Sequence, residues 1–203
     1  LFPPPKSSDV TSFDFPKWAT AGVAAITMSV GLTACGGTDP FDIGWTQSPD
    51  TVTLFSLARP ELNLPSAFDF HLGVSYVLES SASTGQWDLV LDTQDGRLVF
   101  LLPQALGIPS EARIIELPGL TFDEVAEAPS DSTAYTIDDV VTVDLGSVYV
   151  IRTHTGSDQF GFNCVFYAKM EALELDPERG TLLFVYDANP LCGGTDLIAP
   201  DQN

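Results

Sequence analysis

The stretch WDLVLDTQDGRLVFLL, residues 87–102, carries the strongest fold signal in the sequence. Apolar runs lie on both sides of Thr93-Gln94-Asp95-Gly96. Asp-Gly is a preferred dipeptide in two-residue hairpin turns, because both positions there need a positive φ that these residues tolerate. The stretch therefore predicts an antiparallel β-hairpin.

Period-two patterns continue this β character along the chain, where apolar and polar or larger residues alternate as they do in strands. The alternating sets are Phe68, Phe70 and Leu72; Val148, Val150 and Arg152; and Leu183 with Val185. Further strands are expected over residues 52–57, 112–117, 136–144, 164–175 and 181–187.

Helical signals after residue 36 are few. Thr121-Phe122-Asp123-Glu124 matches a capping box, but Pro129 ends any helix within two turns, and residues 103–108 suggest another short turn. Many short strands without long helices favour an antiparallel β-sandwich or barrel, so we predict a mainly β fold.

Residues 18–35, WATAGVAAITMSVGLTAC, form an uncharged and largely apolar run. Its length is near the lower limit of the roughly 17 to 25 residues with which a helix spans a bilayer. We predict a single N-terminal transmembrane helix. Gly22 and Gly31 would permit close packing against other helices, and Trp18 would lie at the membrane interface, so all three are candidate interface residues.

The basic residues indicate the orientation of this anchor. Lys6 and Lys17 precede the run, and the next basic residue is Arg59. The positive-inside rule then places the N-terminus in the cytoplasm and the main domain in the periplasm, with the anchor in a bacterial inner membrane. The expected organisation is a cytoplasmic tail (1–17), the anchor (18–35), a linker (36–50) and a periplasmic β domain (51–203). Trp45 in the linker is a further interface candidate.

The end of the run supports a second interpretation. Leu32-Thr33-Ala34-Cys35, followed by Gly36-Gly37, resembles the lipobox of bacterial lipoproteins. The resemblance implies cleavage before Cys35 and a lipid on that residue. Residues 1–17 are long, Pro-rich and contain Asp9 and Asp14, unlike the compact basic region that begins a signal peptide. We therefore expect an uncut anchor, with the lipoprotein leader as the alternative.

The other two cysteines, Cys164 and Cys192, form an even pair in an oxidising compartment and predict a disulfide. Such a bond would stabilise the domain by roughly 3 kcal/mol in the chain-entropy description. A metal site is the weaker interpretation, because no nearby His or Cys completes a ligand set. No Cys-x-x-Cys-His motif for covalent haem is present.

Charge excludes one class of partner. The chain has 28 acidic and 8 basic residues and a formal net charge of −20. Such a surface repels the phosphates of nucleic acids, so we expect no binding to DNA or RNA. The acidic residues either keep an exported domain soluble or steer a basic partner toward it.

The sequence contains no motif for a reaction. His71 and His154 are the only histidines, and we expect structural roles for both. Acid pairs such as Asp138-Asp139 are expected by chance in so acidic a chain, and Asp92 to Gly96 fits a hairpin turn better than a calcium loop. We therefore predict no catalytic residue, no metal site and no cofactor bound by this chain alone, apart from a lipid if Cys35 is acylated.

Two further resemblances bear on function. The segments Cys164-Val165-Phe166-Tyr167-Ala168-Lys169 and Asn189-Pro190-Leu191-Cys192 resemble uncharacterised bacterial envelope proteins. An anchored, acidic, all-β exported chain also resembles the small accessory subunits of bacterial photosynthetic reaction-centre and light-harvesting complexes. This second resemblance implies that neighbouring subunits carry the pigments and that a basic soluble electron carrier docks nearby.

We therefore expect a non-enzymatic accessory subunit of a membrane complex, held by its anchor, tail and β domain. The alternative is a free-standing envelope lipoprotein that binds a small ligand or polysaccharide. A hydrolase is a third class, and it would need His71 or His154 to meet carboxylates in a concave site.

Overall fold

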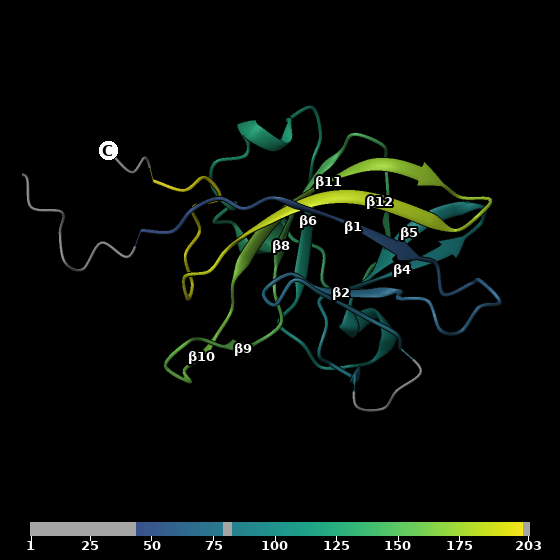
Figure 1. Ribbon diagram of the computed structural model, residues 1–203, viewed down its shortest axis with the longest axis horizontal. Helices are drawn as coiled ribbons and strands as arrows, with labels where there is room; N and C mark the ends of the chain where they lie inside the picture. The colour runs from purple at the N-terminus through teal and green to yellow at the C-terminus, as the bar shows by residue number, and fades with distance from the viewer. Residues whose placement is uncertain (1–43, 79–82, 201–203) are drawn as a thin grey trace, which may run out of the picture. The chain divides into compact units, whose positions relative to one another are not determined.

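The computed structural model describes residues 44–78 and 83–200 (Figure 1). Its strands are β1 (Asp50–Phe55), β2 (Ala67–Asp69), β3 (Val74–Tyr76), β4 (Leu89–Gln94), β5 (Arg97–Leu101), β6 (Arg113–Leu117), β7 (Val141–Thr142), β8 (Val148–Arg152), β9 (Gly156–Ser157), β10 (Asn163–Cys164), β11 (Tyr167–Asp176) and β12 (Thr181–Asn189). Short 3-10 helices are η2 (Pro103–Leu106), η3 (Phe122–Glu124) and η4 (Ser132–Ala134).

The strands form two five-stranded sheets and one small pair. The first sheet has the order β1-β12-β11-β8-β6, the second has the order β3-β2-β4-β5-β7, and β9 pairs with β10. Every pairing between these strands is antiparallel. The prediction of a mainly β, antiparallel fold with almost no helix is confirmed.

One hydrophobic cluster joins the inner faces of both five-stranded sheets. It includes Phe68, Leu91 and Phe100 from the second sheet and Ile151 and Phe184 from the first, all of them buried. The ring of Phe68 meets those of Phe70 and Phe184 edge to face, at centroid distances of 4.9 and 5.4 Å. The two five-stranded sheets therefore share one core.

A second cluster covers the outer face of the first sheet. Val148 and Val150 of β8 pack there with Val125, Tyr135 and Leu197. Residues of β8 that point to either face are therefore buried, which explains why its sequence, VYVIR, is apolar at four positions in succession.

The hairpin predicted from residues 87–102 is confirmed. Strands β4 and β5 pair in a register that places Gln94 opposite Arg97, so Asp95 and Gly96 alone make the turn. Both have positive φ, 50° and 76°, as a type I′ turn requires. The capping box at Thr121 is also present, and it closes the single turn η3.

Other predicted strands are shorter than expected. The alternation through Leu72 ends early, because the side chain of Asp69 accepts hydrogen bonds from the backbone N–H groups of His71 and Leu72 and turns the chain. Leu72 is consequently 60% exposed. Of residues 136–144 only β7 is a strand, and the predicted strand 164–175 is interrupted between β10 and β11.

The predicted anchor, Cys35, Trp18, Gly22 and Gly31 lie outside the described residues. Among residues 44–78 and 83–200, no helix has both the length and the apolar character that a membrane crossing requires. The last part of the predicted linker is attached to the β domain: Trp45 is only 7% exposed, and the backbone N–H of Ser48 donates to Asp187 at 3.4 Å. Contact of Trp45 with another protein stays a prediction, and little of its ring is accessible for it.

Candidate functional site

Strands β8 and β11 continue beyond the sheet as a projecting arm, residues 153–166. The N–H of Thr153 donates to the carbonyl of Phe166 at 2.9 Å, which extends the β8–β11 ladder by one pair. Strands β9 and β10 then pair Gly156 with Cys164 and Ser157 with Asn163. Figure 1 shows this pair extending from the body of the domain below β8.

A hydrogen-bonded turn shapes the tip of the arm. The carboxylate of Asp158 accepts hydrogen bonds from the backbone N–H groups of Phe160 at 2.9 Å and Phe162 at 2.8 Å. The N–H of Asp158 in turn donates to the carbonyl of Phe162 at 3.0 Å. Gly161 has a φ of 82°, a left-handed conformation that glycine adopts without steric cost.

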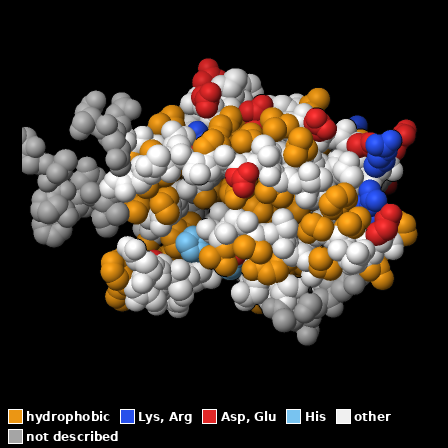
Figure 2. All heavy atoms as spheres, viewed as in Figure 1, with side chains coloured by type: hydrophobic (Ala, Val, Ile, Leu, Met, Phe, Trp, Pro, Cys, Tyr) orange, Lys and Arg blue, Asp and Glu red, His pale blue; other side chains and the backbone are white. Residues whose placement is uncertain are grey.

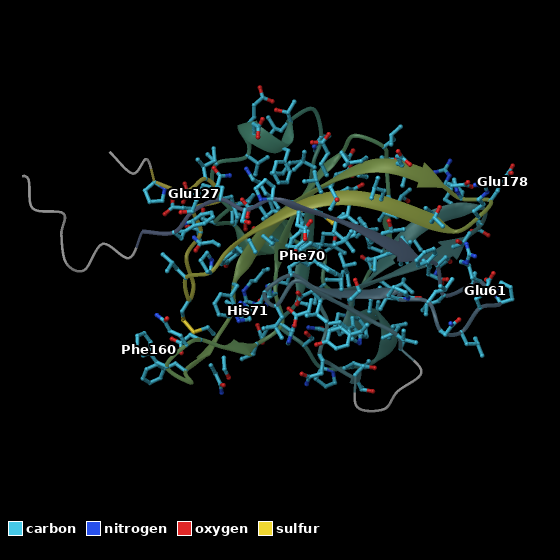
Figure 3. All side chains as sticks on the ribbon, in the orientation of Figure 1. Glu61, Phe70, His71, Glu127, Phe160 and Glu178 are labelled. Carbon is cyan, nitrogen blue, oxygen red and sulfur yellow. A yellow bond between two sulfur atoms is a disulfide. The ribbon has the colours of Figure 1, made fainter. Side chains whose placement is uncertain are left out.

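The same turn presents two phenylalanine rings to solvent. Phe160 is 72% exposed and Phe162 is 68% exposed. In Figure 3 Phe160 lies at the outer end of the arm, where Figure 2 shows a small apolar group. A soluble protein rarely holds two neighbouring phenylalanines outward in a fixed turn, so this tip is a candidate docking site.

The base of the arm is fastened to the domain in two ways. Cys164 is disulfide-bonded to Cys192, in the loop after β12, so the predicted disulfide is confirmed. His71 stacks face to face on the buried ring of Phe166 at a centroid distance of 3.6 Å. Gly156 leaves room for this stack, because a Cβ at that position would lie 3.2 Å from the His71 ring.

A buried polar cluster lies where the two five-stranded sheets meet. Asp88, fully buried just before β4, accepts hydrogen bonds from the backbone N–H of Phe70 at 2.8 Å and of His154 at 2.6 Å. The Nδ1 atom of His154 lies 2.7 Å from the same Asp88 Oδ1. One carboxylate therefore connects the chain after β2 to the chain after β8.

Burial and charge act in opposite directions on the pKa values here. Burial opposes the charged form of His154, but the hydrogen bond to Asp88 and the negative charges of Asp88 and Asp69 outweigh it, so the pKa of His154 is raised. Burial, aided by the charge of Asp88, also raises the pKa of Asp69. The pair formed by Asp88 and His154 is accordingly an ion pair over a wider pH range than an exposed histidine would allow.

This cluster has the residue types of a metal site but the contacts of a hydrogen-bond network. Ligand atoms of Asp69, Asp88 and His154 lie within 4.8 Å of one another. The separation of 2.7 Å between His154 and Asp88 is, however, a hydrogen-bond distance. Two ligands of one zinc ion, each about 2.0 to 2.2 Å from it, would lie farther apart than this at tetrahedral angles. A second group, Asp158 with Cys164 and Cys192, has its sulfurs committed to the disulfide.

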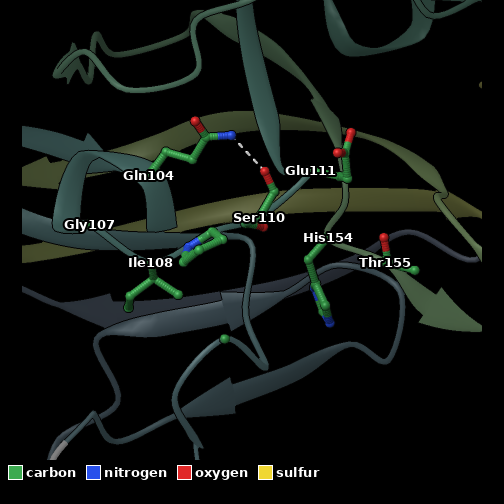
Figure 4. Close-up of a pocket in the computed structure, with 9 residues that line it drawn as sticks. Gln104, Gly107, Ile108, Ser110, Glu111, His154 and Thr155 are labelled. Carbon is green, nitrogen blue, oxygen red and sulfur yellow. Dashed lines mark hydrogen bonds between the residues drawn. The ribbon is translucent and has the colours of Figure 1, made fainter.

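A cleft of about 690 Å³ lies beside His154 (Figure 4). Ser110, Glu111 and Thr155 also line it. The hydroxyl of Ser110 accepts a hydrogen bond from the N–H of Ala112 at 3.1 Å, and within the described part of the chain no hydrogen bond joins it to His154. Asp88 could therefore orient His154 as a base, but Ser110 is not placed as a nucleophile that His154 activates.

Sequence reasoning missed the tip; it named His154 as a residue that could meet carboxylates, but not its partner Asp88. The segment DQFGFN, residues 158–163, contains two phenylalanines around a glycine. This pattern could have predicted a turn with exposed aromatic side chains. Asp88 and His154 are 66 residues apart, so nothing local could have paired them.

Comparison of the chain with known protein families gives no match, and comparison with curated proteins gives none either.

Proposed function

We propose that this chain is a non-enzymatic accessory subunit of a bacterial membrane complex, anchored by residues 18–35 and docked to a neighbouring subunit through the tip of its arm. The observation that carries the proposal is the pair of exposed phenylalanines, Phe160 and Phe162, held in a turn by Asp158. Burying both rings on a partner would contribute about 3 to 6 kcal/mol before the costs of association.

Charge specifies the chemistry of the partner. Asp158 is the only Asp, Glu, Lys, Arg or His between residues 155 and 168, and the whole chain carries a net charge of −20. The complementary surface is an apolar pocket with a rim of Lys or Arg, because opposite potentials guide the encounter and the pocket supplies the affinity. An anionic lipid surface would be repelled by this domain.

Two features support a binding role over a chemical one. The arm is held in place by the disulfide and by the His71–Phe166 stack, so little conformational freedom is lost on docking. The buried Asp88–His154 pair connects the two sheets, a structural task that accounts for it without a reaction.

The complex that we propose is a photosynthetic reaction-centre or light-harvesting assembly, whose pigments belong to other subunits. Copurification of the chain with bacteriochlorophyll, read as absorbance in the assembly fraction, tests this narrower proposal separately. An assembly fraction without pigment absorbance would reject the photosynthetic identity and leave the docking proposal in place.

The direct test is size-exclusion chromatography of gently solubilised membranes that contain either the full chain or its Phe160→Ser/Phe162→Ser variant. We expect the unaltered chain to elute in an assembly and the variant to elute mostly alone. The matched control is Leu62→Ser/Leu145→Ser, which removes two other exposed apolar side chains.

Three results would reject the proposal: equal elution of all three chains, a small particle that begins at acylated Cys35, or tip-dependent binding to protein-free zwitterionic vesicles. The second result would favour the ligand-binding lipoprotein. The third would make lipid the occupant in place of a protein pocket.

A further inference from the structure

A row of three side chains crosses the outer face of the first sheet. Arg113 of β6 lies directly opposite Arg152 of β8, and Arg152 lies directly opposite Tyr167 of β11. Residues directly opposite in antiparallel strands point to the same face, so two guanidinium groups and a tyrosine ring share one patch. The chain from Pro129 to Tyr135 closes over this row and makes a pocket.

The composition of the pocket is unusual for this chain. Only 8 of its 203 residues are Lys or Arg, yet two arginines face each other here. Like charges directly opposite in a sheet are destabilising unless a counter-charge compensates them. Solubility does not account for the two facing arginines, because the many acidic residues of the chain already provide it.

One carboxylate serves both arginines. Arg152 Nη1 donates to Glu111 Oε2 at 2.9 Å and to the Glu111 carbonyl at 2.7 Å, whereas Arg113 Nη2 lies 3.8 Å from the same Oε2. The Nε of Arg113 is buried and has no hydrogen-bond partner among the described residues. Two guanidinium groups therefore share one carboxylate, which leaves a net positive charge beside the pocket.

The remaining lining suits the same kind of ligand. Ser130, Ser132, Tyr135 and Tyr167 surround the arginines in a space of about 160 Å³. Burial, together with the neighbouring Tyr167, raises the pKa of Tyr135, so its hydroxyl stays neutral and donates to the carbonyl of Pro129 at 3.1 Å. A polar pocket of this size accepts a group as small as a carboxylate, phosphate or sulfate.

We infer that this pocket binds the oxyanion group of a small ligand, a carboxylate, phosphate or sulfate, between Arg113 and Arg152. The planar guanidinium fork of an arginine pairs with two oxygens of such a group, and two arginines line this pocket. The inference goes beyond the proposed docking function, since it concerns another face and other residues.

Isothermal titration of the full chain in detergent, with sodium malonate, phosphate and sulfate as separate probes and chloride at matched ionic strength as reference, tests the inference. We expect binding of one anion per chain by at least one of the three probes, and the preferred probe identifies the class of oxyanion. Arg113→Gln and Arg152→Gln should each weaken that binding by about tenfold or more. Arg179→Gln, an equal change of charge at an exposed site, is the matched control and should leave it unchanged.

Glu111→Gln keeps the test decisive if an arginine variant fails to fold. Loss of its carboxylate frees both arginines, so the affinity for the anion should increase several-fold. The inference would be overturned if all three probes bound no more strongly than chloride. It would also be overturned if Arg152→Gln and Arg179→Gln weakened anion binding equally, or if Glu111→Gln left the affinity for the anion unchanged.

Discussion

At the scale of single residues, the buried Asp88 connects two parts of the chain that are far apart in sequence. Its carboxylate accepts three hydrogen bonds, from one backbone N–H after β2 and from the backbone and the ring of His154 after β8. A buried charge is tolerated only where it is paired and fully hydrogen-bonded, and Asp88 meets both conditions when His154 is protonated. The protonation state of one histidine is thereby linked to the contact between the sheets.

The raised pKa of His154 predicts that stability depends on pH. In the unfolded chain a histidine titrates near 6.5, and in the folded chain at a higher pH. The stabilisation is therefore fully present below about pH 6.5 and is lost as the pH rises through the folded pKa. We expect the melting temperature of the wild-type chain to fall as the pH is raised from 6 to 9.

His154→Asn isolates this effect, because asparagine can still donate to Asp88 but cannot titrate. Its melting temperature, followed by circular dichroism over the same pH range, should change less with pH than that of the wild-type chain. The raised pKa of Asp69 acts in the same direction, and both proteins retain that residue. Parallel pH profiles for the two chains would contradict the prediction.

At the scale of elements, the single turn η3 is fixed to strand β11 by a buried lysine. The Nζ of Lys169 donates to the carbonyls of Phe122 at 2.8 Å and Val125 at 3.0 Å, and lies 4.6 Å from the centre of the Phe122 ring. Burial lowers the pKa of Lys169, although the charges of Asp187 and Asp123 oppose that shift. A short turn that could not persist alone is thus held by tertiary contacts.

Lys169→Met tests this attachment. Methionine fills a similar volume but leaves two carbonyls without a donor, so we expect the free energy of unfolding to fall by about 1 to 3 kcal/mol. Urea denaturation measures the change. The control Arg179→Gln, at an exposed site, should stay within about 0.5 kcal/mol of the wild-type chain. An equally small effect of Lys169→Met would show that η3 does not depend on the lysine.

The same elements show how far the sequence could predict the structure. Local chemistry identified the Asp95-Gly96 turn and the capping box at Thr121, because each depends on residues within four positions of one another. The row of Arg113, Arg152 and Tyr167 depends on the register of three strands, and the burial of Lys169 depends on a turn 47 residues away. Such pairings are set by the core as a whole and leave no local pattern.

At the scale of the whole domain, the negative charge and the disulfide have opposite effects on stability. A net charge of −20 destabilises any compact state by self-repulsion. The domain counters this with a core shared by two sheets and with the disulfide between the arm and the loop after β12. Cys192 brings that loop to the arm, and the N–H of Gly193 donates to the carbonyl of Val165 at 3.0 Å.

Removal of the disulfide should therefore act on the whole domain and on the arm to different extents. The bond closes a loop with a sequence separation of 28 residues, so Cys164→Ser/Cys192→Ser should lower the free energy of unfolding by roughly 3 kcal/mol. The arm, whose tip is largely exposed, should also open locally at a lower cost than global unfolding. Under native conditions, chymotrypsin should then cut after Phe160 and Phe162 faster in the variant than in the wild-type chain. If cleavage of the arm is equally fast in both chains while global stability falls, hydrogen bonds and the His71–Phe166 stack alone hold the arm, and the disulfide serves only the body of the domain.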